Sequence, residues 1–85
     1  MAAVNVYLYS TVGCHLCEQA KTILWPVLQQ YQFRLSEIDI AEDDKLIEQY
    51  GTRIPVLRVA NYSNELNWPF TAEQVDAFFA GLVAV

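Results

Sequence analysis

The spacing of apolar residues changes abruptly at Gly13, and this change constrains the fold more than any other feature of the sequence. Over residues 4–9, β-branched and aliphatic residues alternate with polar and aromatic ones, a pattern typical of a strand. From about residue 14 to residue 31, apolar residues recur every three or four positions, which predicts a helix. The chain therefore begins with a strand that passes through a glycine loop directly into a helix.

The rest of the chain continues this alternation, which we interpret as one domain over residues 1–85. We expect a strand over 33–40, a short helix after the acidic turn 41–44, strands over 54–60 and 65–68, and a last helix from Thr71. The first two strands should be parallel with a right-handed crossover, and the last two should form an antiparallel hairpin. The order β-α-β-α-β-β-α thus predicts an α/β fold with a four-stranded mixed sheet flanked by helices on both faces.

Individual residues predict how the helices begin and bend. Ser10 and Thr11 are candidate N-caps for the first helix, and Thr71 and Gln74 have the spacing of a capping box at the last one. Pro26 lies inside the first helical pattern, where it removes one backbone hydrogen bond and clashes with the preceding turn. Because the apolar spacing continues beyond Pro26, we expect a kink there rather than the end of the helix.

The sequence also predicts the positions of one glycine and two tryptophans in the fold. Gly51 suits the C′ position that follows the short helix. Trp25 and Trp68 are expected in the core, since a small domain needs its large aromatic side chains inside. An exposed Trp68 near the cysteines would instead indicate a docking patch.

The composition argues against several classes of protein. With 54% apolar and 13% aromatic residues, the 85-residue chain has the means to bury a dense core. Its net charge is −5 and its five lysines and arginines are scattered, whereas nucleic-acid binding needs clustered positive charge. Residues 1–9 lack the positive charge of a signal peptide, and no run of about 18 apolar residues occurs, so we expect no membrane association. We expect a monomeric cytoplasmic protein.

The two cysteines, Cys14 and Cys17, lie where the first strand gives way to the first helix, and a Cys-x-x-Cys pair in a βαβ pattern is a redox signature. Spaced three apart, the thiols face the same side of the helix, with Cys14 near unpaired backbone N–H groups of the first turn. These groups and the helix dipole favour the thiolate and lower a cysteine pKa from about 8.5 to roughly 3.5–7.5. Cys14 is thus the predicted nucleophile, and Cys17, a turn deeper, is placed to resolve the mixed disulfide.

Other interpretations of this motif stay open. His15, the only histidine, either adds positive charge beside Cys14 when protonated, which lowers the pKa of that thiol further, or is an ordinary solvated residue. The cysteines could be two inert buried apolar residues. A zinc ion normally takes four ligands and the chain has no second cluster of Cys or His, so we expect no metal.

Two segments match a known pattern, together with the terminal strand and helix. They are Leu8-Tyr9-Ser10 leading into Gly13-Cys14-His15-Leu16-Cys17-Glu18, and Arg53-Ile54-Pro55-Val56. Here the chain resembles the glutaredoxin and thioredoxin-like family, and more specifically small bacterial glutaredoxin-like proteins. The resemblance implies a thioredoxin-like fold of glutaredoxin type in which the Ile54-Pro55 peptide is cis and lies against the cysteines. Its backbone would pair with an extended peptide or with glutathione. Taken alone, Pro55 would be a proline at the start of an edge strand.

The chain departs from the family pattern at four places. Between the cysteines the family typically has Pro-Tyr or Pro-Phe, and this chain has His15-Leu16. The lysine that holds a glutathione carboxylate in the family is absent from the segment Ser10, Thr11 and Val12, and the family's threonine before the proline is Arg53 here. The turn that binds the γ-glutamyl end of glutathione is replaced by Trp68-Pro69-Phe70-Thr71. Arg53 either holds a substrate carboxylate with its planar fork or is an ordinary solvated arginine.

These features predict a thiol–disulfide oxidoreductase of glutaredoxin type that reduces or exchanges protein or glutathione mixed disulfides. The reacting groups are Cys14 and Cys17, and the predicted substrate-binding residues are His15, Arg53, Ile54 and Pro55. We expect no bound cofactor, with glutathione as a candidate co-substrate. Two alternatives remain: a non-catalytic thioredoxin-fold binding or adaptor module, and a redox sensor.

Overall fold

The computed structural model describes residues 4–83, so both ends of the predicted domain lie outside the described residues. The elements in this range are β1 (Asn5–Ser10), α1 (His15–Tyr31), β2 (Arg34–Asp39), the 3-10 helix η1 (Ile40–Glu42), α2 (Asp44–Tyr50), β3 (Val56–Val59), β4 (Glu65–Asn67) and α3 (Ala72–Val83). The predicted order of strands and helices is confirmed. The short helix η1 is an addition within the acidic segment that the sequence did not indicate.

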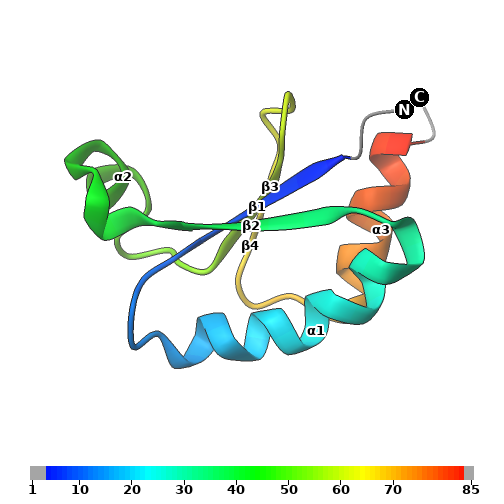
Figure 1. Ribbon diagram of the computed structural model, residues 1–85, viewed down its shortest axis with the longest axis horizontal. Helices are drawn as coiled ribbons and strands as arrows, with labels where there is room; N and C mark the ends of the chain where they lie inside the picture. The colour runs from blue at the N-terminus through cyan, green and yellow to red at the C-terminus, as the bar shows by residue number, and fades with distance from the viewer. Residues whose placement is uncertain (1–3, 84–85) are drawn as a thin grey trace.

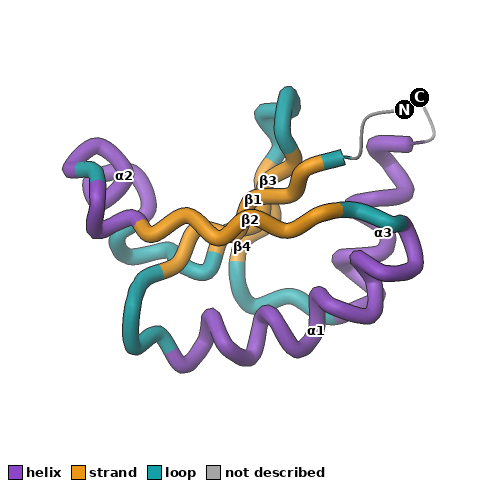
Figure 2. The backbone as a smooth tube through the Cα atoms, in the orientation of Figure 1, coloured by secondary structure: helices purple, strands orange, loops and turns teal. Residues whose placement is uncertain are grey.

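The four strands form one mixed sheet in the order β2-β1-β3-β4 (Figures 1 and 2). The pair β1 and β2 is parallel, whereas β1 with β3 and β3 with β4 are antiparallel. The parallel pair and the hairpin were predicted, and the β1–β3 pairing joins the two halves of the chain. In Figure 1, α1 lies below the sheet, α3 rises at the right-hand side and contacts α1, and α2 lies at the left-hand end.

The main core fills the space between the sheet and the helices α1 and α3. Each central strand contributes alternate residues to it, because successive side chains of a strand point to opposite faces. Its buried members include Val6 and Leu8 of β1, Leu57 and Val59 of β3, Ala20, Leu24 and Leu28 of α1, and Val75 and Phe79 of α3. Most apolar positions of the first helical pattern therefore face the sheet, whereas Leu16 is 43% exposed.

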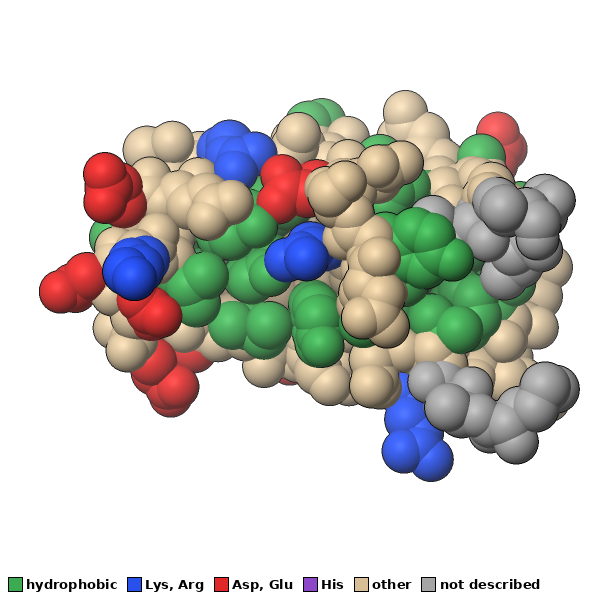
Figure 3. Space-filling model, turned by 90° about the horizontal axis from the view of Figure 1, so that it is seen from above, with side chains coloured by type: hydrophobic (Ala, Val, Ile, Leu, Met, Phe, Trp, Pro, Cys, Tyr) green, Lys and Arg blue, Asp and Glu red, His purple; other side chains and the backbone are tan. Residues whose placement is uncertain are grey.

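A smaller cluster lies on the opposite face of the sheet beside α2. The rings of Tyr9 and Tyr50 stack there, with centroids 4.1 Å apart. The Tyr50 hydroxyl donates to Glu65 Oε2 at 2.6 Å, which links α2 to β4. Burial raises the pKa of Tyr50 above its ordinary value of 10.0, and the bond to Glu65 raises it further. Figure 3 looks onto this face and shows acidic side chains gathered at its left, the end at which α2 lies.

The helix ends agree only in part with the sequence. α1 does not begin at the candidate caps Ser10 and Thr11, because its N-cap is Cys14. The helix continues through Pro26 as predicted and reaches Tyr31. At α3 the capping box is confirmed by two bonds: the Thr71 N–H donates to Gln74 Oε1 at 2.8 Å, and the Gln74 N–H donates to Thr71 Oγ1 at 3.2 Å.

Two local predictions need correction. Gly51 ends α2, but its φ of −53° is right-handed, so it does not serve as a left-handed C′ residue. Its lack of a side chain matters for space, since a Cβ there would lie 2.5 Å from the Ile47 carbonyl oxygen. Trp25 is 51% exposed rather than buried, whereas Trp68 packs against the main core. Within residues 4–83 the structure contains no helix that combines the length and hydropathy needed to cross a membrane.

Candidate active site

The loop between β1 and α1 makes a tight turn at Gly13. The Cys14 N–H donates to the Thr11 carbonyl at 3.4 Å across four residues, and Gly13 has a φ of +80°. A type II turn needs positive φ at its third residue, and glycine adopts it without the steric cost that a side chain brings. This turn delivers Cys14 directly to the start of α1.

Cys14 is the N-cap of α1, and its sulfur takes the place that a serine or threonine oxygen holds at an ordinary cap. The Sγ atom accepts a hydrogen bond from the backbone N–H of Cys17 at 3.1 Å. That N–H belongs to the donors that a helix start leaves without a partner inside the helix. The Cys14 sulfur therefore lies against the positive end of the α1 dipole.

The two cysteines are joined in a disulfide, with their Cα atoms 5.2 Å apart. Their burial differs: Cys17 is 2% exposed, whereas Cys14 is half-buried. Cys14 is thus the sulfur that a partner from solution meets first, and Cys17 lies behind it.

The Ile54-Pro55 loop lies at the same end of the sheet as the cysteine loop. Tyr9 pairs with Val56, so the next pair in the antiparallel register is Ser10 and Pro55. Ser10 is the last residue of β1, immediately before the turn that leads to the cysteines. The register therefore brings together the two loops that the sequence analysis singled out.

The Ile54-Pro55 peptide is cis, as the resemblance to glutaredoxins implies. The Trp68-Pro69 peptide is also cis, which the sequence did not indicate. The Pro55 carbonyl accepts a bond from the Trp68 N–H at 3.2 Å, and the Ile54 N–H donates to the Tyr50 carbonyl at 3.2 Å. These bonds fasten the proline loop to β4 on one side and to the end of α2 on the other.

The Arg53 guanidinium already bonds to other residues of this chain. Its Nε and Nη2 atoms donate to the Gln49 carbonyl at 3.2 and 3.0 Å, and Nη1 reaches Glu65 Oε1 and Asn67 Oδ1 at 3.4 Å each. The guanidinium also lies 5.0 Å above the centre of the Tyr50 ring. A substrate carboxylate would therefore have to share Arg53 with α2 and β4.

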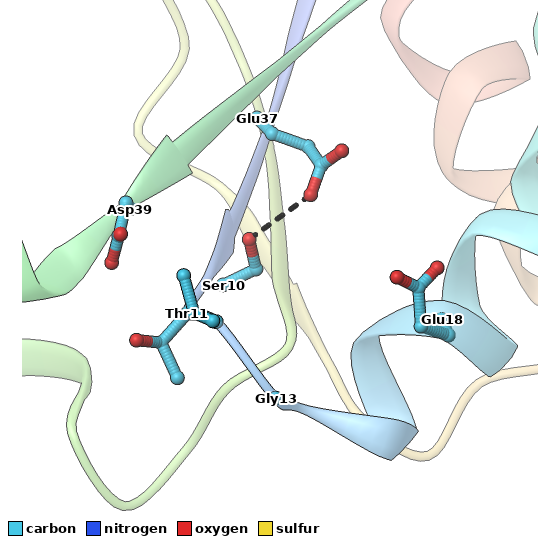
Figure 4. Close-up of a pocket in the computed structure, with 7 residues that line it drawn as sticks. Ser10, Thr11, Gly13, Glu18, Glu37 and Asp39 are labelled. Atoms are coloured by element: carbon cyan, nitrogen blue, oxygen red, sulfur yellow. Dashed lines mark hydrogen bonds between the residues drawn. The ribbon is translucent and has the colours of Figure 1, made fainter.

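A hollow of about 440 Å³ opens beside the cysteine loop, and acidic residues line much of it (Figure 4). Its lining consists of Ser10, Thr11, Val12, Gly13, Glu18, Glu37 and Asp39. Ser10 Oγ donates to Glu37 Oε2 at 3.2 Å, the bond drawn in Figure 4. A smaller hollow of about 210 Å³ adjoins it and is lined by Gly13, Cys14, His15 and Glu18.

Lys21 bridges two of these carboxylates from α1. Its ammonium lies 3.0 Å from Glu18 and 3.1 Å from Glu37, and these two bonds raise its pKa. This cluster was not predicted from the sequence. The spacing of three residues between Glu18 and Lys21 could have indicated one of the two bonds, but no local pattern connects Lys21 with Glu37.

A protein-family model described as "Glutaredoxin-like domain (DUF836)" matches residues 5–80. The chain belongs to this glutaredoxin-like family. The glutaredoxin-like protein YDR286C homolog of Dictyostelium discoideum is 27% identical to it over 60 residues, covering 64% of this chain and 56% of that relative. This glutaredoxin-like chain thus matches little more than half the length of that relative.

Solved structures place the glutaredoxin-like chain in a wider fold group. It is 34% identical to protein XcR50 from X. campestris, with a TM-score of 0.79 over 89% of this chain and 96% of that one. Thioredoxin 2 from Pseudomonas aeruginosa PAO1, solved in its reduced form, is 17% identical, with a TM-score of 0.74 over 99% of this chain and 82% of that one. The predicted thioredoxin-like α/β fold is confirmed.

Proposed function

We propose that this glutaredoxin-like protein is a thiol–disulfide oxidoreductase in which Cys14 is the nucleophile and Cys17 the resolving thiol. The observation that carries the proposal is the bond from the Cys17 N–H to the Cys14 sulfur at 3.1 Å. In the reduced protein the same N–H would donate to a thiolate, and a hydrogen bond to the charged form lowers the pKa of a thiol. The α1 dipole acts in the same direction.

The reaction proceeds by two exchanges of sulfur. The Cys14 thiolate attacks one sulfur of a substrate disulfide, forms a mixed disulfide and releases the other substrate sulfur as a thiolate, which takes a proton from water. Cys17 then loses its proton and attacks the Cys14 sulfur, which releases the second substrate thiolate and closes the Cys14–Cys17 disulfide. The substrate gains two electrons and the protein loses them. A thiol reductant, with glutathione as one candidate, must return the protein to its dithiol form.

The difference in burial between the cysteines supports this order of events. Cys14 is half-buried and open to a partner, whereas Cys17 at 2% exposure is reached only by a group already bound at Cys14. We also propose that the backbone around Ile54 and Pro55 borders the substrate chain. The β1–β3 register supports this, because it brings Pro55 beside the strand end that leads to Cys14.

The proposal is tested by trapping the intermediate. With a disulfide-bonded protein as substrate and dithiothreitol as electron donor, the wild-type protein should accelerate reduction. The Cys14→Ser variant should reduce the substrate no faster than dithiothreitol alone, because the nucleophile is missing. In a separate reaction, the reduced Cys17→Ser variant, freed of dithiothreitol before the substrate is added, should accumulate a mixed disulfide through Cys14, detected by mass spectrometry, because no second thiol is present to resolve it.

Two results would reject this function. One is a wild-type protein that accelerates no exchange with either dithiothreitol or glutathione as donor. The other is a set of bound partners that stays the same when both cysteines are replaced, which would favour an adaptor module.

A further inference from the structure

Glu18 stands at the boundary between the reacting sulfur and the acidic hollow. It lines the smaller hollow with Cys14 and His15, and it lines the larger one with Glu37 and Asp39. The Glu18 N–H donates to the Cys14 carbonyl at 3.3 Å, so Glu18 lies one helical turn beyond Cys14. Figure 4 shows Glu18 on α1 and Glu37 on β2 at one side of Ser10, with Asp39 of β2 farther away beyond Thr11. Its side chain is 72% exposed, so its carboxylate is accessible to a substrate that approaches Cys14.

The charges around this space are predominantly negative. The residues that line the two hollows include three carboxylates and neither a lysine nor an arginine. Among residues 4–83, Lys21 is the one cation bonded to them, and it is shared between Glu18 at 3.0 Å and Glu37 at 3.1 Å. Asp39 lies outside that triad. Even with His15 protonated, the negative charges therefore outnumber the positive ones.

We propose that Glu18 makes the cysteine pair selective for disulfides flanked by positive charge, such as those beside lysine or arginine in a polypeptide. The inference rests on the proposed exchange function and adds the substrate class. A negative rim raises the local concentration of cationic partners and repels anionic ones, oxidised glutathione among them. Because Glu18 is largely exposed, salt screens the effect, so the preference is a rate effect that weakens as ionic strength rises.

A negative side chain in the first turn also stabilises a helix through the dipole, so the test has to separate this structural role from substrate selection. The chain offers a matched control in Glu73, which is exposed and lies in the first turn of α3. Glu73 is not among the residues that line either hollow beside Cys14. Glu73→Gln therefore removes an equivalent helix charge without changing the rim of the site.

The experiment compares three small disulfides with the same two-carbon arms. Cystamine is a dication, bis(2-hydroxyethyl) disulfide is uncharged and 3,3′-dithiodipropionate is a dianion. Each rate with the reduced protein at low ionic strength is divided by the rate of the same disulfide with 2-mercaptoethanol, so that leaving-group differences cancel. We expect the normalised rates to fall from cation to neutral to anion, and to converge in about 1 M salt.

Glu18→Gln should lower the cystamine rate about threefold and raise the dithiodipropionate rate about threefold, which is the effect of one charge roughly 6 Å away in water. Glu73→Gln should leave their ratio unchanged. A shift in the pKa of Cys14 alters all three rates by the same factor, so the ratio reports charge recognition alone. Equal normalised rates in the wild type, or equal shifts in the two variants, would overturn the inference while the exchange function stands. A reduced protein that reacts with none of the three disulfides would overturn both.

Discussion

Cys14 is both the N-cap of α1 and the more exposed sulfur of the pair. A side chain at an N-cap points back at free backbone N–H groups, so a sulfur there is held against hydrogen-bond donors. From the sequence, Cys14 was predicted near the helix start, and Ser10 and Thr11 were candidate N-caps, since hydroxyl side chains are common at that position. Those residues come too early, because the turn at Gly13 separates them from the helix.

Gly13 is the residue on which the geometry of this turn depends. Gly13→Ala should lower the free energy of unfolding by about 1–2 kcal/mol, because an L-residue with a side chain pays that cost in left-handed backbone. The described surroundings add no clash, since a Cβ at Gly13 would meet no atom within 4 Å other than those of its chain neighbours. Urea unfolding of the oxidised protein measures the change.

Gly81 provides the control for this substitution. It lies within α3, and among residues 4–83 a Cβ there would also meet no atom within 4 Å beyond its chain neighbours and its own helix backbone. Gly81→Ala should therefore stabilise the protein by about 0.5–1 kcal/mol, since alanine is the better helix former. If both substitutions change stability in the same direction, the backbone at Gly13 does not have the role assigned to it.

The elements were predictable in type because each has a clear period, and they were less predictable at their ends. The predicted strand over 54–60 is shorter in the structure, where Val56–Val59 forms the ladder and the cis proline precedes it. Helical periodicity could also have predicted that Trp25 is exposed. Leu24 and Leu28 lie on the buried face of α1, and Trp25, one position away from Leu24, falls outside their stripe and is exposed.

The contact between α2 and the sheet carries a dependence on pH. Burial and the bond to Glu65 raise the pKa of Tyr50 in the folded protein, so the neutral phenol is favoured by folding. Its contribution to stability is complete below the unfolded pKa of about 10 and is lost as the pH rises through the folded pKa. Tyr50→Phe should cost about 1.5–3 kcal/mol near pH 8, the worth of a hydrogen bond to a charged group.

Above a pH of about 10, the difference in stability between wild type and Tyr50→Phe should shrink, because only the wild type has this phenol to ionise on unfolding. Urea unfolding of the oxidised forms at pH values on either side of this point measures the difference, and the disulfide removes thiol titration from it. A difference that stays constant across the range would show that Tyr50 does not carry the effect.

At the scale of the molecule, the order of strands in the sheet brings the segments of the candidate site together, although they are distant in the sequence. The sequence predicted the parallel pair and the hairpin, which follow from local connections. It did not predict the pairing of β1 with β3, because strands about 50 residues apart leave no local signal of their contact. That pairing puts Ser10 opposite Pro55 and so brings the cysteine loop and the proline loop to one end of the sheet.

The same distinction separates the predictable part of the site from the rest. The cysteines and their place at a strand–helix junction follow from spacing and period. The cis peptide at Pro55 came only through resemblance, since most X-Pro bonds are trans and the sequence does not mark the exceptions. The bond from Lys21 to Glu37 depends on β2 lying beside β1, so it becomes visible only once the sheet is assembled.

The most direct measurement is the thiol pKa of Cys14, titrated by thiolate absorbance in the Cys17→Ser variant so that one sulfur is observed. Folded protein should give a value within roughly 3.5–7.5, and the same variant unfolded in urea should give about 8.5, because only the fold supplies the helix start. A folded value at or above about 8.5 would contradict the account, since the backbone of α1 would then not be stabilising the sulfur as an anion.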